Sequence, residues 1–445
     1  MKPIQRFYLG LVAVLTALWA FADPAWRASD PNYFVWRASL TNLTGVLGIA
    51  VMSVGMVLSV RPRRLEPLLG GLDKMYRLHK WLGISGLVLS IGHWALAKSP
   101  RYLIDLGWVT RPVRGPRVPE TNPILQFFQS QRHLAETIGE YAFYVMVVLL
   151  AMALIKRLPY RPVFKTHRWL AAVYLALVAH SVVLMKFSFW GGVLGPLTAV
   201  LMVFGSAAAV VSLLRRVGVE RKVGGVIEAL EHHPDSQVLR VDVQLQGRWN
   251  GHEAGQFAFV TFDQKEGAHP YTIASAWQGN GRLFFLIKGD GDHTGTLPAR
   301  LKVGDPCTLE GPYGRFVFDT DRPRQIWVAG GIGITPFIAR LKALADKTTP
   351  DAAPVDLFWS TRVIEAEAQR RLTEDAAKAG VRLHVLVDKR DGRLTMDRIT
   401  AAVPEWARSD VWFCGPAAFG RALREQFSAR GLGAEHFHQE LFQMR

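Results

Sequence analysis

Cysteine is nearly absent from this sequence: Cys307 and Cys414 are the only two among 445 residues. Two cysteines exclude a disulfide scaffold, a cysteine zinc cluster and a four-cysteine iron–sulfur cluster. A metal ion held within the chain must therefore rely on histidine, methionine or carboxylate ligands. Acidic residues are also scarce, since 37 Asp and Glu face 53 Lys and Arg, which gives a formal charge of +16.

That charge alone is typical of nucleic-acid-binding proteins, but the apolar content argues against them. Hydrophobic residues make up 49% of the chain, and the mean hydropathy is +0.12. Disordered basic proteins lack this apolar content. A basic protein with long apolar runs is more typical of membrane proteins, whose Lys and Arg concentrate in cytoplasmic loops. We therefore expect a lipid bilayer as partner and no nucleic acid.

Six apolar runs of 16 to 25 residues follow one another in the N-terminal half. A membrane-spanning helix needs about 20 apolar residues, with a range of about 17–25. The runs are Phe7–Ala22, Ala38–Val60, Trp81–Ala97, Thr137–Ile155, Trp169–Met185 and Trp190–Leu214. The sequence therefore predicts an all-α, six-helix transmembrane domain over residues 1–216.

Lys and Arg follow the second, fourth and sixth runs, which predicts that these connections and both termini are cytoplasmic. The segment 98–136 would then face outward as a structured cap or a loop, although it carries six Lys or Arg. The first run has an alternative interpretation as a cleavable signal peptide, because Lys2 and Arg6 precede it and Ala20–Ala22 ends it. Cleavage would leave five helices and the same cytoplasmic C-terminus.

Two of the apolar runs carry paired histidines, which are costly inside a bilayer and usually functional there. His79 and His93 are 14 residues apart, while His167 and His180 are 13 apart. Neutral imidazole is an axial ligand of haem iron, so we expect His79 with His167 and His93 with His180 to hold two haems. Thirteen residues miss four helical turns by about 140°, so a 3₁₀ stretch or different rotamers must compensate. Interfacial histidines are the alternative.

Residues 217–445 have the pattern of a soluble module. Short strand-like runs over 217–320 predict a small antiparallel β-barrel; they are Val238–Leu245, Gln256–Phe262, Arg282–Ile287 and Cys307–Leu309. From residue 321 to 445, strands alternate with helices, which predicts a doubly wound parallel α/β domain. Its predicted strands are Gln325–Ala329, Val355–Trp359, Val381–Val387 and Val411–Cys414. A flavin needs an aromatic ring, a hydroxyl group and a cation for its pyrophosphate, and Tyr271, Thr272 and Lys288 supply these groups in the barrel.

A glycine loop follows the strand Gln325–Ala329 and opens a helix at Pro336. Such a loop lets the backbone approach a pyrophosphate, and the helix N-terminus attracts its charge. Its residues predicted to bind dinucleotide are Gly330, Gly331, Gly333, Thr335 and Pro336. Arg362 follows a second strand and favours NADPH over NADH through the 2′-phosphate, with NADH as the alternative. Taken alone, Cys414 would be a buried structural thiol.

Together these motifs resemble the ferric reductase and NADPH oxidase superfamily over nearly the whole chain. The histidine spacing is similar to the family's bis-haem pattern. His269-Pro270-Tyr271-Thr272-Ile273-Ala274-Ser275 resembles its flavin motif, with Tyr271 in place of Phe, and Gly291-Asp292-His293-Thr294 resembles Gly-Asp-Trp-Thr, with His293 in place of Trp. Cys414-Gly415-Pro416 is similar to its NADPH site.

The resemblance implies roles for single residues. The flavin-binding set would be His269, Pro270, Tyr271, Thr272, Ser275, Lys288 and Thr294, and Gly415 and Pro416 would join the nucleotide site. Cys414 would lie by the nicotinamide, Phe442 would stack on the flavin, and Arg37 would lie near the outer haem. Superoxide-producing members often carry a further His where this chain has Ala97, which argues against oxygen as acceptor.

We therefore expect an NAD(P)H-dependent oxidoreductase of a bacterial-type inner membrane, with its soluble domains in the cytoplasm. It would pass electrons from NADPH through FAD and two b-type haems to oxygen, ferric iron or a quinone outside. No obligatory protein partner is evident. One alternative is a membrane-anchored flavin reductase that feeds a quinone or a periplasmic protein. Another is a transporter with a regulatory nucleotide-binding domain.

Overall fold

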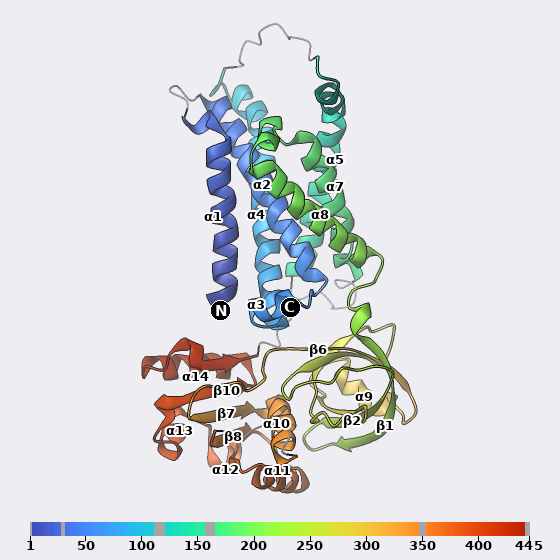
Figure 1. Ribbon diagram of the computed structural model, residues 1–445, viewed down its shortest axis with the longest axis vertical. Helices are drawn as coiled ribbons and strands as arrows, with labels where there is room; N and C mark the ends of the chain where they lie inside the picture. Colours follow the sequence, from blue (N-terminus) through green and yellow to red (C-terminus); the bar gives the residue numbers. More distant parts are fainter. Residues whose placement is uncertain (1, 28–31, 111–120, 156–164, 347–352, 441–445) are drawn as a thin grey trace. The chain divides into compact units, whose positions relative to one another are not determined.

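The computed structural model describes residues 2–27, 32–110, 121–155, 165–346 and 353–440 (Figure 1). The chain divides into two compact units, one ending at Val217 and the other beginning at Gly218. The first unit is helical, and the second contains two β-sheets with their helices.

Each predicted apolar run lies mainly on one long helix of the first unit, although Trp190 and Gly191 of the sixth run precede its helix in a separate short element. The long helices are α1 (Lys2–Ala22), α2 (Tyr33–Ser59), α4 (Leu72–Asp105), α5 (Pro123–Leu154), α7 (Leu170–Leu184) and α8 (Leu194–Leu213). The short elements are η1 (Pro24–Arg27), α3 (Leu65–Leu69) and η2 (Phe187–Gly191). The predicted outer segment is partly helical, because α4 continues to Asp105 and α5 begins at Pro123, where the Asn122 side chain caps it.

Five helices within the described residues are long and apolar enough to cross a membrane. They cover Pro3–Ala22, Tyr33–Ser59, Pro123–Leu154, Lys165–Leu184 and Leu194–Leu213. Helix α4 contains the third predicted run but is more polar over its 34 residues and is not among these five. The prediction of six spans is thus supported for five helices and stays a prediction for α4.

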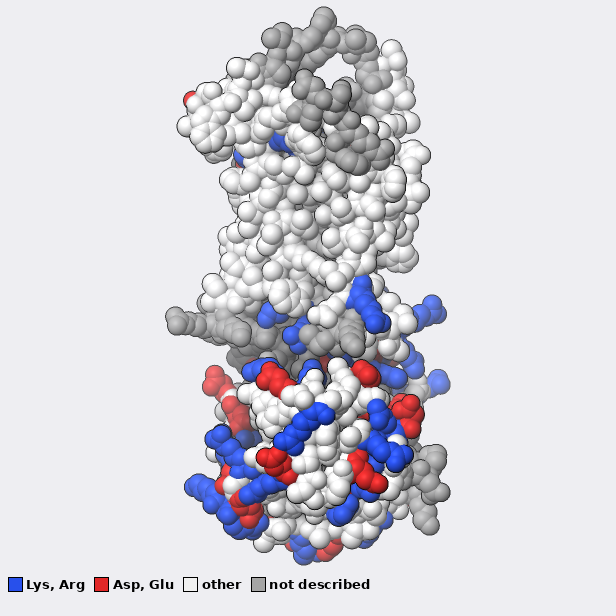
Figure 2. All heavy atoms as spheres, turned by 90° about the vertical axis from the view of Figure 1, so that its left-hand side faces the viewer, with Lys and Arg blue, Asp and Glu red and all other residues white. Residues whose placement is uncertain are grey.

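Helix α2 is the centre of the helical unit, since Ile49, Ala50 and Val51 are almost completely buried. Gly45 of α2 lets the His93 ring of α4 approach closely, because a β-carbon at position 45 would lie 3.2 Å from that ring. Apolar side chains instead cover the outside of the unit, and Phe21 of α1 is 78% exposed. Figure 2 shows few charged side chains on the helical unit's visible face. An apolar exterior of this kind is what contact with lipid requires.

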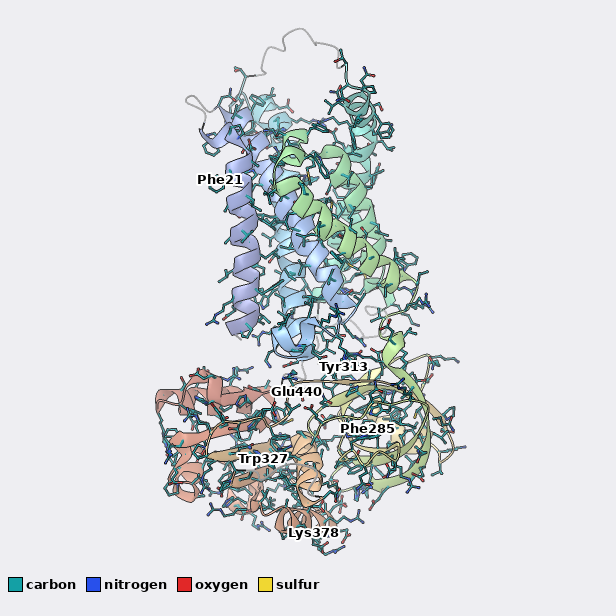
Figure 3. All side chains as sticks on the ribbon, viewed as in Figure 1. Phe21, Phe285, Tyr313, Trp327, Lys378 and Glu440 are labelled. Carbon is teal, nitrogen blue, oxygen red and sulfur yellow. The ribbon has the colours of Figure 1, made fainter. Side chains whose placement is uncertain are left out.

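The second unit begins with η3 (Val219–Arg221) and a six-stranded antiparallel sheet in the order β4-β3-β6-β1-β2-β5. Its strands are β1 (Lys222–His233), β2 (Val238–Gln246), β3 (Phe257–Thr261), β4 (His269–Thr272), β5 (Arg282–Lys288) and β6 (Pro306–Tyr313). The short helices η4 (Thr294–Thr296) and α9 (Leu297–Arg300) follow β5. Phe285, labelled in Figure 3, is fully buried in the core of this sheet.

The prediction of a closed barrel is wrong in one respect. The sheet is antiparallel, but its outer strands β4 and β5 meet only at a single isolated bridge between Ile273 and Phe285. The chain leaves β4 directly after Thr272, so no continuous ladder forms between these strands. Strand β1 was not predicted, because Gly224 and Gly225 and a bulge after Ile227 interrupt its apolar alternation.

The rest of the chain forms a parallel sheet in the order β11-β10-β7-β8-β9, as predicted for a doubly wound domain. Its strands are β7 (Arg324–Gly330), β8 (Val355–Thr361), β9 (Arg382–Val387), β10 (Ser409–Cys414) and β11 (Phe437–Gln439). Its helices are η5 (Gly331–Ile334), α10 (Thr335–Ala345), α11 (Ala366–Lys378), α12 (Asp388–Asp391), α13 (Met396–Ala402), η6 (Trp406–Arg408), α14 (Ala417–Ala429) and η7 (Ala434–His436).

Alternate residues of the central strand β7 enter separate cores on the two faces of this sheet. Trp327 packs with Phe337 of α10 on one face, and Val328 packs in the cluster of Phe427 from α14 on the other. Both faces are therefore covered by helices, as a buried parallel sheet requires. The carboxyl ends of β7, β8 and β10 remain together at one edge, where a nucleotide binds in folds of this class.

Candidate cofactor sites

The four predicted histidines form two pairs in the helical unit. The ring centroids of His79 and His167 lie 6.0 Å apart, and those of His93 and His180 lie 6.2 Å apart. One member of each pair comes from α4 and the other from the segment that contains α7. Both predicted pairings therefore exist as contacts, and no pairing across the other diagonal is observed among the described residues.

Hydrogen bonds fix the orientation of three of these rings. Nδ1 of His79 lies 2.9 Å from the carbonyl oxygen of Gly55, and Nδ1 of His180 lies 2.8 Å from that of Ala135. Nδ1 of His93 lies 3.0 Å from the carbonyl oxygen of Thr41. A carbonyl only accepts, so each Nδ1 carries the proton and donates it. Each Nε2 then keeps its lone pair, which is the tautomer of a metal-binding imidazole.

The spacing between the rings fits one metal ion in each pair. Metal–imidazole bonds are about 2.0–2.1 Å long, so two imidazoles on opposite sides of one ion have centroids about 6 Å apart. The observed 6.0 and 6.2 Å match this value. His79, His93, His167 and His180 thus fit the axial positions of two bis-imidazole iron centres, which the resemblance assigns to haem.

The offset of 13 residues between His167 and His180 is partly compensated by a local tightening of the helix. Three backbone hydrogen bonds of the 3₁₀ type join Trp169 to Thr166, Ala171 to Arg168 and Ala172 to Trp169. A 3₁₀ turn rotates the chain by about 120° per residue instead of about 100°. This stretch supplies about 60° of the missing rotation. The side-chain rotamers of the two histidines must supply the rest, so both explanations that the sequence left open contribute.

Residues around the outer pair are held by ion pairs. Lys186 contacts the buried carboxylate of Asp23 at 3.1 Å, and Lys98 contacts Glu140 at 2.8 Å. Arg37 precedes Thr41, the hydrogen-bond partner of His93, by one turn of α2, and its Nε is buried with no hydrogen-bond partner in the described parts of the chain. Arg37 thus lies one helical turn from a residue that contacts His93, and its predicted place near the outer haem stays a prediction.

The flavin motif forms strand β4 and the turn after it. His269, Pro270, Tyr271 and Thr272 are the strand, and the Ser275 hydroxyl accepts a hydrogen bond from the backbone of Phe284 at 3.4 Å. Burial raises the pKa of the Tyr271 hydroxyl, whose oxygen is buried and bonded to no other described residue. A neutral phenol that lacks a protein partner is suited to bond a ligand.

The second flavin segment follows β5. Lys288 ends this strand and pairs with Asp290 at 3.0 Å, and Thr294 accepts a hydrogen bond from the backbone of Gly291 at 3.2 Å. The imidazoles of His269 and His293 stack with centroids 4.3 Å apart, which brings the two motifs together. Burial, aided by the nearby His293, lowers the pKa of His269. The lowered pKa favours its neutral form at physiological pH.

The glycine loop packs directly against the Cys414–Pro416 segment. A β-carbon at Gly333 would overlap the carbonyl oxygen of Cys414, and one at Gly330 would lie 2.7 Å from the ring of Pro416. Gly331 has a φ of +56°, and a β-carbon at this position would meet no atom within 4 Å. Its carbonyl accepts a hydrogen bond from the Trp359 indole at 3.0 Å. Strand β7 thus ends at the loop, and α10 begins at Thr335 with Pro336 in its first turn.

Cys414 is 2% exposed, and burial together with the charge of Glu440 raises the pKa of its thiol. Glu440 is 5% exposed and lies against Gly314, at the join between the two sheets of this unit. Sequence reasoning missed Glu440. A single acidic residue near the end of the chain carries no pattern that distinguishes it from a solvated one.

Two predicted residues of this unit remain, Arg362 and Phe442. Arg362 is exposed directly after β8, at the same sheet edge as Gly330 and Gly415. Phe442 lies outside the described residues, so its predicted stacking on the flavin stays a prediction.

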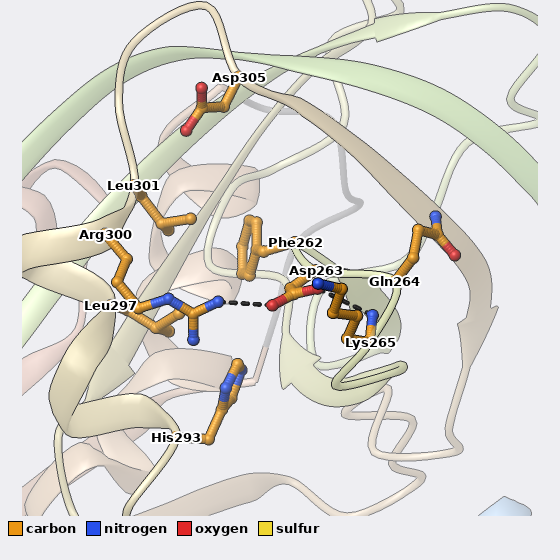
Figure 4. A pocket seen from close by; sticks show the side chains of 9 residues that line it. All are labelled: Phe262, Asp263, Gln264, Lys265, His293, Leu297, Arg300, Leu301 and Asp305. Carbon is orange, nitrogen blue, oxygen red and sulfur yellow. Dashed lines mark hydrogen bonds and ion pairs between the residues drawn. The ribbon is translucent and has the colours of Figure 1, made fainter.

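A cavity of about 370 Å³ opens beside the stacked histidines (Figure 4). His293 and Arg300 lie on its wall, and Arg300 pairs with Asp263 at 2.6 Å. The other residues that line it are Phe262, Gln264, Lys265, Leu297, Leu301 and Asp305.

Comparison with protein families finds two matches that follow the two units. Residues 44–178 match the ferric reductase like transmembrane component, and residues 225–318 match the oxidoreductase FAD-binding domain. Through these two domains the chain matches the ferric reductase and NADPH oxidase-like superfamily. It is a multi-pass membrane protein with a ferredoxin-reductase-type module for FAD and NAD(P), and its class is that of an oxidoreductase.

Individual relatives match only part of this ferric-reductase-like chain. The glycine betaine monooxygenase reductase subunit of Chromohalobacter salexigens is 26% identical over 207 residues, 42% of this chain and 55% of that protein. The heme-dependent oxidative N-demethylase beta subunit of Ectopseudomonas mendocina is 31% identical over 146 residues, 33% of this chain and 44% of that protein. The chain thus spans about half the length of the curated relatives it matches.

Among solved structures, the cytochrome P450 reductase GcoB of Amycolatopsis aligns with a TM-score of 0.44 and 22% identity. The alignment covers 50% of this chain and 70% of that one.

Proposed function

We propose that this protein is a transmembrane oxidoreductase that passes electrons from NADPH through FAD and two b-type haems to an acceptor on the outer face. The observation that carries this proposal is the pair of histidine contacts, His79 with His167 and His93 with His180, formed by the same two helical segments. The pairs are about 21 Å apart along α4, because 14 residues rise about 1.5 Å each. Two metal centres at this separation connect the two halves of a bilayer.

The bound flavin supplies the exchange between the two-electron chemistry of nicotinamide and the one-electron chemistry of haem. The chain's own groups position these partners. Gly330, Gly331 and Gly333 let the backbone approach the dinucleotide, and the N-terminus of α10 attracts its phosphates. Cys414 stays a protonated thiol at neutral pH, which suits a packing contact with the nicotinamide rather than a nucleophile. NADH is the alternative donor.

In the membrane, the chain's task is to hold the two irons in a fixed geometry. The Gly55, Thr41 and Ala135 carbonyls keep three imidazoles in the ligand tautomer, so that little rearrangement is needed when the iron changes its charge. The Lys- and Arg-rich connections predict that the reductase unit is cytoplasmic in a bacterial-type inner membrane. Electrons would then move outward. The membrane potential opposes each electron by about 2.3 kcal/mol per 100 mV.

Ferric iron, oxygen and a quinone are the acceptor classes. Arg37, whose Nε is buried and whose backbone lies one turn of α2 before Thr41, supports an anionic or polarised acceptor near the outer pair. Ala97 occupies the position at which superoxide-producing relatives often carry a histidine, and this favours ferric iron or a quinone over oxygen. The acceptor is expected to be a small molecule, with no obligatory protein partner.

A membrane-anchored flavin reductase is the second candidate. It accounts for the reductase unit but leaves the four paired imidazoles without a role. A transporter accounts for neither the pairs nor the flavin motif.

The test uses the full-length protein in sealed vesicles whose reductase unit faces the medium. NADPH added without oxygen should reduce the flavin first and then bis-imidazole haem bands. In a second preparation, a membrane-impermeant ferric chelate enclosed in the vesicles should be reduced and should delay haem reduction until it is consumed. Flavin reduction that leaves haem oxidised in vesicles without the chelate, or a preparation with flavin and no haem, would support the anchored flavin reductase instead.

A further inference from the structure

Three side chains at the edge of the flavin-binding sheet bring their ligand atoms together. Glu266, His269 and His293 each offer one nitrogen or oxygen atom, and these three atoms all lie within 4.8 Å of one another. A carboxylate oxygen of Glu266 lies 3.9 Å from Nε2 of His269. All three side chains are partly buried, so water and ions reach them.

The sequence places the third member of this set where the related flavin motif has an indole. His293 stands in Gly291-Asp292-His293-Thr294 at the position of Trp, and no part of the proposed electron transfer uses its imidazole. An indole cannot bind a metal ion through a lone pair, whereas an imidazole can. The departure therefore adds a possible ligand beside Glu266 and His269, which already lie close together.

The distances suit a small transition-metal cation. Ligand bonds of about 2.0–2.1 Å in a tetrahedron set the ligand atoms about 3.4 Å apart, so the three atoms need to approach by about 1 Å. The His269 and His293 rings are stacked with planes 14° apart, so one ring must turn about its χ2 angle. This torsion is broad for histidine, and its rotation is inexpensive.

We propose that Glu266, His269 and His293 bind one divalent transition-metal cation of the Zn²⁺ class. Two imidazoles and a carboxylate are a ligand set that Zn²⁺ accepts, and its fourth position stays open to water. The cavity beside His293 gives the ion a path from solvent (Figure 4). The neighbouring Asp263 forms an ion pair with Arg300, so we do not count it as a ligand of this site.

The site has a consequence for flavin loading that rests on the proposed function. In the proposed function His269 belongs to the flavin motif, so the cation and the flavin compete for the same side chain. Zn²⁺ should therefore slow the uptake of FAD by the flavin-depleted protein. Metal binding itself does not depend on the electron-transfer proposal.

The test measures metal in purified full-length protein, both flavin-loaded and flavin-depleted, after equilibration with ZnCl₂ and removal of free metal. Wild type should hold one equivalent more than Glu266→Gln and His293→Trp, in at least the flavin-depleted state. His232→Gln changes an exposed histidine of the same sheet and should keep the wild-type metal content. Circular dichroism and the flavin content of Glu266→Gln show whether that variant is folded.

Cobalt provides a second readout that needs no variant. Co²⁺ in a tetrahedral site of nitrogen and oxygen ligands absorbs visible light far more strongly than hydrated Co²⁺, so wild type should show this band and lose it when Zn²⁺ is added. Equal metal content in wild type and both variants, or Co²⁺ that keeps its hydrated spectrum, would overturn the proposal. Haem reduction by NADPH, measured in the same samples, reports separately on the proposed function.

Discussion

The His180 imidazole packs onto Gly139 of α5 so closely that a methyl group at position 139 would occupy the place of Nδ1. That same nitrogen donates to the Ala135 carbonyl, one turn earlier on α5, at 2.8 Å. The missing side chain at Gly139 thus creates the space for the His180 ring, whose centroid lies 6.2 Å from that of His93. A residue with no ligand atom therefore determines whether the outer pair forms.

Gly139→Ala should remove the outer haem and leave the inner one. The added methyl group displaces the His180 ring, and overpacking of this kind costs about 1–3 kcal/mol. Haem content should fall by about half, measured as pyridine haemochrome per chain. Gly83→Ala is the matched control, because a β-carbon at Gly83 of α4 meets no atom within 4 Å. Full haem content in Gly139→Ala would show that His180 is not a ligand.

Arg362→Ala should reduce discrimination between the two nicotinamide donors. Loss of one charge-assisted hydrogen bond to the 2′-phosphate, about 1.4 kcal/mol, corresponds to about a tenfold lower kcat/KM for NADPH. The kcat/KM for NADH should stay unchanged, measured as flavin-dependent ferricyanide reduction. Arg408→Ala, at the opposite edge of the sheet before β10, controls for the loss of positive charge. An equal decrease with both donors would place Arg362 outside the 2′-phosphate site.

Stability should fall in mild acid because of His252. Burial lowers the pKa of His252 below its ordinary 6.5, and its Nε2 lies 2.9 Å from the Ser275 carbonyl. Protonation would place a proton on Nδ1, which is buried and bonded to no described residue. The unfolded chain therefore binds this proton first, so stability is full above pH 6.5 and decreases below it, by at most about 1.4 kcal/mol per pH unit.

The measurement is the temperature at which flavin fluorescence appears on heating, recorded between pH 7.5 and 5.5. His252→Gln keeps a hydrogen-bond donor and cannot titrate, so its melting temperature should change less over this interval. An identical pH dependence in wild type and His252→Gln would assign the effect to other groups.

The histidine pairs were predictable from the sequence because ionisable residues inside apolar runs are rare and their spacing can be counted. The 3₁₀ bonds between Thr166 and Ala172 were foreseen only as one of two explanations for the 13-residue offset. Gly139 gave no signal, since its role depends on the approach of a helix more than 30 residues later. Contacts between distant segments of this kind cannot be found by local periodicity.

In the second unit, too, local sequence patterns predicted some elements, whereas contacts between distant segments could not be predicted. Strands β7, β8, β9 and β10 were predicted because a buried parallel strand is a continuous apolar run. The antiparallel sheet was harder to predict: β1 contains Gly224 and Gly225, and the ladder needed to close the sheet is reduced to the bridge at Ile273. Glu440 lies beside Cys414 only after β11 has joined the sheet.

The central claim is that the two histidine pairs each hold an iron. Its most direct test is the haem content and optical spectrum of purified wild type and of His79→Ala, His167→Ala, His93→Ala and His180→Ala. The account predicts two low-spin haems per wild-type chain, and one in every variant, while NADPH still reduces the flavin. Wild-type protein without haem, or variants that retain both haems, would contradict it.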